Sequence, residues 1–179
     1  YARTSGELKL RLLRFSRLFE SAQVTESAEA STVSLKGKMT LSDALAAIEQ
    51  QTGNTIVDYR GRYGQQSDNS EVSLELEGVP FWEAVDQLLD EAGLTLNNFV
   101  GEPRKLALVA AGETALPRFR RGEYAGLFRI EPTVLTAEKN LRDSAGDILR
   151  MGIEIVWEPR VVPILIQQDL EGIEITADT

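Results

Sequence analysis

The segment from Asp58 to Gly64 concentrates side chains that could bind a ligand. Its sequence, Asp-Tyr-Arg-Gly-Arg-Tyr-Gly, places two aromatic rings and two guanidinium groups on a turn that glycine makes adaptable. Aromatic rings offer stacking surfaces, and guanidinium groups donate paired hydrogen bonds to carboxylates. The candidate interaction residues of this turn are Tyr59, Arg60, Arg62 and Tyr63. The alternative is a solvated connection whose tyrosine rings lie on the adjacent sheet.

Trp82 is a fifth candidate interaction residue. It lies beside Phe81 at the start of a predicted helix. An exposed tryptophan at this position would anchor a protein interface, whereas a covered one would belong to the core. A cluster of arginines at 118, 120 and 121 could pair with an acidic partner, although a charge cluster in a linker is usually hydrated.

Few residues of this sequence could carry out catalysis. The chain has no Cys and no His, which excludes thiol nucleophiles, Ser-His-Asp triads and metal sites built from either residue. A carboxylate-based hydrolase remains a weaker option, but Glu154 and Glu158 would lie about 13 Å apart on one strand face, too far for a concerted pair. No phosphate-binding glycine motif is present in the sequence. The sequence therefore favours a protein that is not an enzyme and has no metal site.

Charge and hydropathy narrow the class of partner. The 179 residues include 19 Lys and Arg against 28 Asp and Glu, which gives a formal net charge of −9. A nucleic-acid-binding surface must neutralise phosphates, so this acidic balance argues against nucleic acid. The longest stretch without charge, 92–101, has ten residues. A membrane-spanning helix needs about 20 apolar residues, so we expect no span in this sequence.

An internal repeat is the strongest structural signal. Residues 40–56 and 80–96 align at an offset of 40, with an alanine, a glycine and a threonine conserved between the copies and apolar positions matched in kind. Each copy is preceded by Val-Ser-Leu, at 33–35 and 72–74. The apolar spacing predicts a helix in each copy, which a left-handed glycine ends and a short strand follows. The predicted unit is strand, helix, strand, used twice.

The N-terminal region, 1–30, has a different pattern. Apolar residues at helical spacing predict an amphipathic helix at 6–21, followed by a linker. Basic residues on this helix would suit an anionic membrane surface, and the alternative is a helix packed on a protein domain. Because the sequence begins with Tyr1 rather than Met, we expect it to be part of a longer chain.

The C-terminal region, 112–179, is predicted to be a linker and a β-rich segment. A clean alternation of apolar and polar residues over 149–157 predicts a strand, and 128–135 is its predicted hairpin partner. Further strands are expected at 161–166 and 172–177. We interpret this region as the opening of an incomplete β-sandwich-like domain, and the alternative is an added sheet.

The region between these two, 31–111, resembles the short N-terminal domain shared by secretins and TonB-dependent receptors. The resemblance covers roughly 80 of the 179 residues and rests on these runs: Val33-Ser-Leu35, Leu41-Ser-Asp-Ala-Leu45, Gln51-Thr-Gly53, Ile56-Val-Asp-Tyr59, Val72-Ser-Leu74, Phe81-Trp-Glu-Ala-Val85 and Ala92-Gly-Leu-Thr95. It implies an α+β fold in which two helices lie between two small β-sheets.

The same resemblance implies a non-catalytic interaction or scaffold module of a bacterial cell-envelope protein. In that family the module passes a signal to a membrane-bound regulator or contacts inner-membrane components, and it uses no cofactor. We therefore expect an exported protein, in the periplasm or cell envelope, with a protein partner there. The residues themselves leave an alternative, a carbohydrate- or peptidoglycan-binding module that uses the 58–64 loop.

Overall fold

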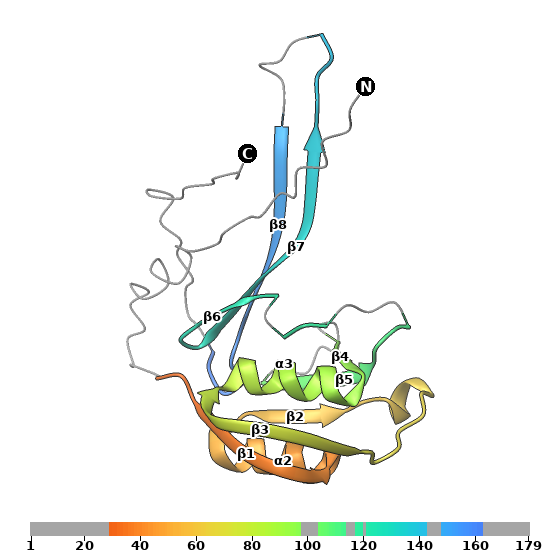
Figure 1. Ribbon diagram of the computed structural model, residues 1–179, viewed down its shortest axis with the longest axis vertical. Coiled ribbons are helices and arrows are strands. Elements are labelled where there is room, and N and C mark those ends of the chain that lie inside the picture. The colour runs from red at the N-terminus through yellow and green to blue at the C-terminus, as the bar shows by residue number, and fades with distance from the viewer. Residues whose placement is uncertain (1–28, 98–103, 114–116, 120, 143–147, 163–179) are drawn as a thin grey trace.

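The computed structural model describes residues 29–97, 104–113, 117–119, 121–142 and 148–162 (Figure 1). The helix expected at 6–21, the strand expected at 172–177 and most of the one expected at 161–166 lie outside these residues. The elements are, in chain order, β1 (Thr32–Thr40), α2 (Leu41–Thr52), β2 (Thr55–Asp58), the 3-10 helix η1 (Gly61–Tyr63), β3 (Glu71–Pro80), α3 (Phe81–Ala92), β4 (Leu94–Leu96), β5 (Lys105–Ala110), β6 (Glu123–Ala125), β7 (Phe128–Glu138) and β8 (Ile148–Trp157).

Local sequence explains where the two α-helices begin and end. The Thr40 hydroxyl oxygen accepts a hydrogen bond from the backbone N–H of Asp43 at 3.2 Å, which caps the start of α2. The same hydroxyl donates to the Asp43 carboxylate at 2.7 Å, so that carboxylate does not reach back to the backbone as in a full capping box. Both helices end at a glycine with left-handed backbone, Gly53 at φ 69° and Gly93 at φ 65°.

Two small sheets accompany these helices. β1 and β3 pair antiparallel, and each runs directly into the helix that follows it. In the second sheet β5 lies in the middle, parallel to β2 and antiparallel to β4. The strand after the second helix thus has its antiparallel partner in β5, the next strand of the chain.

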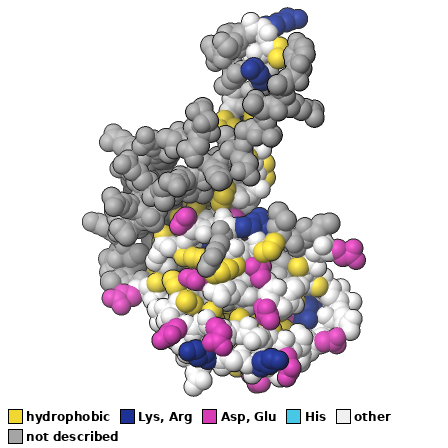
Figure 2. Space-filling model, in the orientation of Figure 1, with side chains coloured by type: hydrophobic (Ala, Val, Ile, Leu, Met, Phe, Trp, Pro, Cys, Tyr) yellow, Lys and Arg dark blue, Asp and Glu magenta, His cyan; other side chains and the backbone are white. Residues whose placement is uncertain are grey.

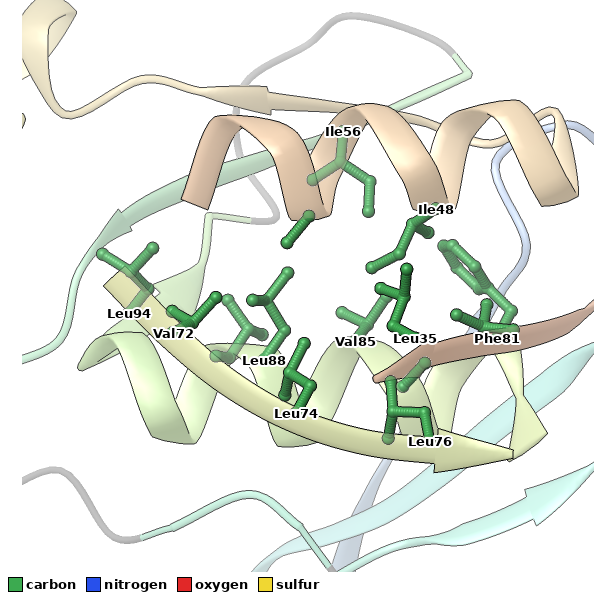
Figure 3. Close-up of a cluster of buried hydrophobic side chains, with 14 of the residues drawn as sticks. Leu35, Ile48, Ile56, Val72, Leu74, Leu76, Phe81, Val85, Leu88 and Leu94 are labelled. Carbon is green, nitrogen blue, oxygen red and sulfur yellow. The ribbon is translucent and has the colours of Figure 1, made fainter. Parts of the chain in front are cut away.

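One hydrophobic cluster joins both helices to both sheets. In Figure 3 the side chains of Ile48 from α2 and of Val85 and Leu88 from α3 point into the same cluster. The strands contribute the remaining apolar side chains, among them Leu35, Ile56, Leu74, Leu76, Leu94 and Leu108. The alternating burial of β1 and β3 shows that one face of their sheet covers this cluster. The described residues therefore have a mixed α+β fold, with two α-helices and several small sheets.

The third sheet, in the order β6-β7-β8, is antiparallel and carries a projecting ribbon. The predicted hairpin is confirmed, because β7 and β8 pair along their whole length. A bulge lies at Thr133, between the pairs Pro132–Ile153 and Val134–Gly152. Below it the sheet has its own small core; above it the two strands extend away from the rest of the molecule (Figure 1). We call residues 133–138 and 148–152 the arm. Within the described residues the expected sandwich is represented by this single sheet.

Candidate interaction surfaces

The 58–64 loop is held together by its own side chains. The Arg60 guanidinium donates to the Asp58 carboxylate, with Nε at 3.0 Å and Nη2 at 2.7 Å, and Nη2 also donates to the backbone oxygen of Asp68 at 3.0 Å. These hydrogen bonds hold the pKa of Asp58 below its usual value and raise the pKa of Arg60. Arg60 is 7% exposed, so its paired donors are used inside the loop.

The aromatic residues of this loop have different environments. Tyr59 is 8% exposed, and the guanidinium carbon of Arg62 lies 5.0 Å from the centre of its ring. Tyr63, at the end of η1, is 52% exposed. Of the four candidate residues in the loop, only Arg62 and Tyr63 are exposed. This arrangement favours the interpretation of the segment as a connection packed on the adjacent sheet.

Trp82 belongs to the core, which corrects the alternative of an exposed anchor. Its side chain is 1% exposed, and its ring meets Phe81 edge to face with centres 5.1 Å apart. The indole N–H donates to the backbone oxygen of Leu127 at 3.0 Å. Trp82 therefore joins α3 to the turn between β6 and β7, and it is unavailable to an external partner.

Trp82 is the first of three residues on one face of α3 that contact the chain beyond residue 112. Asp86 and Asp90 follow at successive intervals of four, which places all three along one side of the helix. The Asp90 carboxylate accepts hydrogen bonds from the backbone N–H groups of Arg118 at 2.7 Å and Phe119 at 2.8 Å. The expected linker after residue 112 is thus attached to α3 at these positions.

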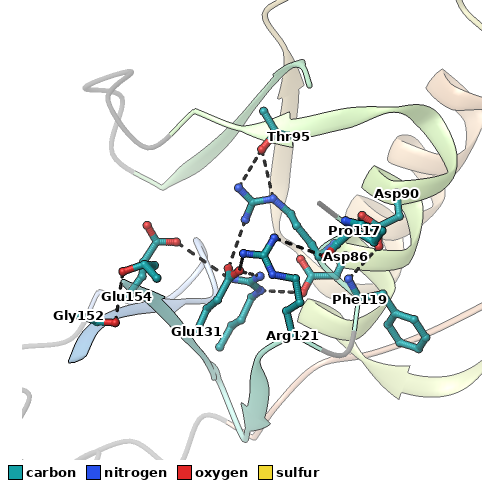
Figure 4. Close-up of polar contacts among 12 residues, drawn as sticks. Asp86, Asp90, Thr95, Pro117, Phe119, Arg121, Glu131, Gly152 and Glu154 are labelled. Atoms are coloured by element: carbon teal, nitrogen blue, oxygen red, sulfur yellow. Dashed lines mark hydrogen bonds and ion pairs between the residues drawn. The ribbon is translucent and has the colours of Figure 1, made fainter. Parts of the chain in front are cut away.

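Asp86 is the centre of a buried ionic cluster (Figure 4). Arg129 of β7 donates from Nε to Asp86 Oδ2 at 2.7 Å and from Nη2 to Glu131 Oε2 at 2.6 Å. The hydroxyl of Tyr124 on β6 donates to the same Asp86 oxygen at 2.9 Å. Asp86 and Arg129 are both 0% exposed. The cluster therefore connects α3 to two strands of the third sheet, and the ion pair at its centre, Asp86 with Arg129, has no contact with solvent.

Two of the three arginines at 118–121 belong to this cluster, which corrects the expectation that they are hydrated. Arg121 Nη2 lies 2.9 Å from Glu131 Oε1, and Arg118 Nη1 lies 3.7 Å from Glu131 Oε2. Arg118 also donates from Nη2 to the Thr95 hydroxyl at 2.8 Å. Glu131 is 4% exposed, and a buried carboxylate needs such cationic neighbours. The third arginine, Arg120, lies outside the described residues.

Burial and charge pairing have opposite effects on the pKa values of this cluster. Burial raises the pKa of Asp86, because the attraction of Arg129 and the hydrogen bonds from Arg129 and Tyr124 only partly offset the loss of hydration. Burial alone would lower the pKa of Arg129, but the charges of Asp86 and Glu131 outweigh it and raise that pKa. Within the described residues, Asp86 Oδ1 has no hydrogen-bond partner. Because the carboxylates of Asp86 and Glu131 are bound to arginines, the cluster is suited to holding elements together.

A second polar cluster surrounds Glu158, directly after β8. This carboxylate is 0% exposed and accepts from the backbone N–H of Ser31 at 2.8 Å, from Asn54 Nδ2 at 2.9 Å and from Arg160 Nε at 2.7 Å. Glu158 thus connects the end of β8 to the start of β1 and to the residue before β2. These contacts, together with its burial, leave it unsuited to the carboxylate pair with Glu154 considered above.

A small hollow adjoins the first cluster and lies between the end of α3, β4 and residues 117–118. Its volume is about 120 Å³, and its lining includes Leu89, Asp90, Leu94, Thr95 and Arg118. The Asp90 carboxylate is already occupied by backbone N–H groups, and the Arg118 guanidinium by Thr95 and Glu131. The hollow therefore offers a ligand few uncommitted polar groups.

Most of the exposed apolar side chains of the third sheet lie on the arm; Trp157, at the other end of β8, is 37% exposed. The first four residues of β7 are all buried, whereas Val134 is 60% and Leu135 46% exposed. On β8, Ile148 is 40% and Leu149 49% exposed. In the space-filling view, hydrophobic side chains are visible along the arm, and Lys or Arg side chains lie near its tip (Figure 2). An exposed apolar strand pair of this kind is typical of an interaction surface.

Sequence reasoning overlooked both the cluster at Asp86 and the arm as a surface. The signal for the cluster was the spacing of Trp82, Asp86 and Asp90, which places two carboxylates in line with an aromatic ring on one side of a helix. The signal for the arm was the apolar alternation of β8 beyond the length that the small core of the third sheet can cover.

The comparisons with known proteins supply no relative: no family model, curated protein or solved structure matches this chain. Among the helices of the described residues, none has the length and apolar character needed to cross a bilayer. The same residues contain no cluster of three or more acidic side chains that could hold a metal ion.

Proposed function

We propose that this chain is a non-catalytic protein–protein interaction module of a bacterial cell-envelope protein, located in the periplasm or envelope. The α+β unit formed by β1 to β5 acts as a rigid base, and the arm is the surface that meets the partner. The observation that carries this proposal is the exposed apolar surface of the arm, described above, on a strand pair that extends beyond its own core. The resemblance to the short N-terminal domain of secretins and TonB-dependent receptors supports the location.

We also propose that the base is a duplicated module with its two helices between two small sheets. The two helices have equal length and begin 40 residues apart, and each is preceded and followed by a strand. Left-handed glycines at equivalent positions, 53 and 93, support the same origin. A duplication would explain why one hydrophobic cluster takes side chains from both copies.

Site-specific photo-crosslinking in cells that produce the full-length protein tests the proposed function. A photoreactive amino acid replaces Leu149 on the arm, and a matched control replaces Gln50, which is exposed on α2. We expect adducts with one or a few envelope proteins from position 149 and none from position 50. Adducts with cytosolic proteins alone, or equal labelling from both positions, would contradict the proposal.

Glycan binding by the 58–64 loop remains a second proposal, and it rests on Tyr63, which is 52% exposed beside the exposed Arg62. Co-sedimentation of the purified chain with isolated cell walls tests it. Binding that disappears in Tyr63→Ala but persists in Leu149→Ala would favour the loop over the arm. Equal sedimentation of Tyr63→Ala and the unsubstituted chain would reject the loop as a glycan site.

A further inference from the structure

The free edge of β8 can be assigned residue by residue. The backbone N–H of Glu158 donates to Leu127 at 3.1 Å, and Pro132, which has no N–H, lies opposite Ile153. Because bonded and non-bonded pairs alternate in an antiparallel ladder, Glu154 and Val156 direct their N–H and C=O groups toward β7. Leu149, Met151, Ile153 and Ile155 direct their N–H and C=O groups away from β7, toward the edge of the sheet. In the described part of the chain no strand pairs with that edge.

The same four edge residues also share one face of the ribbon. Leu149, Met151, Ile153 and Ile155 lie at intervals of two, so their side chains point to one side of the sheet. Ile153 and Ile155 pack against the small core of the third sheet, whereas Leu149 is 49% exposed. The edge therefore combines unpaired backbone groups with an apolar face, the two features that β-strand addition uses.

Within the described residues, the edge strand lacks three of the common protections against pairing with another strand. β8 contains neither Pro nor Lys, and the bulge at Thr133 lies on β7 rather than on the edge. A two-stranded ribbon without further support is at best marginally stable in water. An additional strand along β8 would both pair the edge and enlarge the sheet.

The side chains of β8 are arranged so that a second copy of the same strand fits it. From Leu149 to Ile155 the sequence reads apolar, basic, apolar, glycine, apolar, acidic, apolar. An antiparallel pair with its two-fold axis at Gly152 would place Arg150 opposite Glu154 of the other copy, twice. On the apolar face it would place Met151 opposite Ile153. Such an isologous contact satisfies the symmetry of a closed dimer.

The geometry at the axis supports this register. The carbonyl of Gly152 accepts from the Thr133 hydroxyl at 3.3 Å, so the backbone of Gly152 faces β7 and the central pair of the dimer would be non-bonded. Non-bonded pairs bring side chains closest together, and glycine leaves that space to the flanking Arg150 and Glu154. In the single chain Arg150 pairs with Glu138 at 3.4 Å, but both side chains are more than 60% exposed. Such a surface pair is easily exchanged.

We propose that the partner at this edge is a second copy of the chain, joined by antiparallel β8–β8 pairing centred on Gly152. This inference rests on the proposed function, because it names the occupant of the arm. It deepens that function by making the module a symmetric dimer in which two α+β bases lie at opposite ends of a continuous sheet.

Charge reversal across the two-fold axis tests the proposal. In sedimentation velocity runs on the purified 179-residue chain, we expect a dimer whose dissociation constant rises roughly tenfold or more in Arg150→Glu and in Glu154→Arg, because each substitution creates two like-charged cross-strand pairs. An equimolar mixture of the two variants should dimerise again, since both contacts become attractive in the heterodimer. Arg142→Glu and Glu77→Arg are the matched controls outside 149–155, both at exposed positions, and they should leave the dimer unchanged.

Several outcomes would overturn the dimer. A monomeric chain at all attainable concentrations, or controls as disruptive as the test variants, would exclude the β8 contact. Failure of the mixture to recover would exclude the register. If Glu154→Arg did not fold, a comparison of the dissociation constants of Arg150→Glu and Arg142→Glu would still test the β8 contact, because Arg150 and Arg142 are both exposed. A monomer in solution together with specific envelope adducts from position 149 would reject self-pairing and leave the proposed function intact, whereas loss of both results would reject both.

Discussion

The two α-helices of the described residues have equal length, each follows a strand of the same sheet and each ends at a left-handed glycine, but they differ in the burial of one face. At the offset of 40, Trp82, Asp86 and Asp90 of α3 correspond to three residues of α2, namely Ser42, Ala46 and Gln50. The three α2 residues are exposed, whereas Trp82 and Asp86 are fully buried and Asp90 is half-buried. The inner faces of both helices contribute to the same hydrophobic cluster. In α3 Trp82 belongs to this cluster as well, and Asp86 and Asp90 bind the chain beyond residue 112, whereas the corresponding side of α2 is exposed.

This comparison suggests how an α+β unit can acquire an appendage without changing its core. A helix that packs on one face only has a solvent-exposed side that is free to vary. In α3 three positions on that side carry an indole donor and two carboxylates, and each bonds to the segment 117–131. Substitutions at these positions should therefore affect stability strongly in α3 and weakly in α2.

The largest effect is expected from Asp86→Ala. The change leaves Arg129 with one carboxylate fewer in a fully buried site, and removing one member of a buried ion pair costs about 3–5 kcal/mol. Urea denaturation measures the free energy of unfolding. The matched substitution Ala46→Ser on α2 should change it by less than about 0.5 kcal/mol. A double variant, Asp86→Leu with Arg129→Met, should be more stable than Asp86→Ala, because it leaves no unpaired charge at these two positions. If the double variant were less stable than Asp86→Ala, the Asp86–Arg129 pair would stabilise the contact between α3 and the third sheet by more than the neutralisation of each charge by the other.

Trp82→Phe should have the next largest effect. The substitution keeps an aromatic ring but removes the N–H that bonds to Leu127, whose carbonyl still accepts from the backbone N–H of Glu158. The lost hydrogen bond and the space left by the larger buried ring should together cost about 1–3 kcal/mol. The same denaturation measurement, with Ser42→Ala as the control at the equivalent position of α2, gives the difference. Equal effects of the two substitutions would contradict the view that α3 alone is a two-sided helix.

Asp90→Ala should destabilise the protein by about 1–2 kcal/mol, since it removes the acceptor for two backbone N–H groups at a partly solvated position. Gln50→Ala is its matched control on α2. Amide hydrogen exchange of Arg118 and Phe119 provides a local readout. Their exchange should accelerate in Asp90→Ala and stay unchanged in Gln50→Ala; unchanged exchange in both would place the attachment of this segment elsewhere.

These comparisons also indicate what the sequence could predict and what it could not. The helix bounds were predictable because the cap at Thr40 and the stops at Gly53 and Gly93 are local, and the β7–β8 hairpin was predictable from its alternation. The burial of Trp82 and the pairing of Asp86 with Arg129 were not, because both depend on a segment more than forty residues away returning to α3. Spacing alone does not show whether the second face of a helix is covered.

The smallest effects, and the most diagnostic ones, should come from pH. Burial raises the pKa of Asp86, so the folded state binds a proton at this carboxyl group more tightly than the unfolded state does. The protonated carboxyl group therefore contributes stability below about pH 3.8, and this contribution declines as the pH rises through the raised pKa. Asp58 should show the opposite trend, because its pKa is lowered by Arg60: its contribution is present above about pH 3.8 and is lost as the pH falls through the lowered value. The measurement is the free energy of unfolding of each variant, Asp86→Asn or Asp58→Asn, subtracted from that of the unsubstituted chain between pH 3 and 7. Plotted against pH, the two differences should have slopes of opposite sign, and the difference for Gln50→Ala should have no slope. Slopes of the same sign would mean that Arg129 and Tyr124 stabilise the Asp86 carboxylate more than burial destabilises it. The contact between Asp86 of α3 and Arg129 of β7 would then be an ordinary salt bridge.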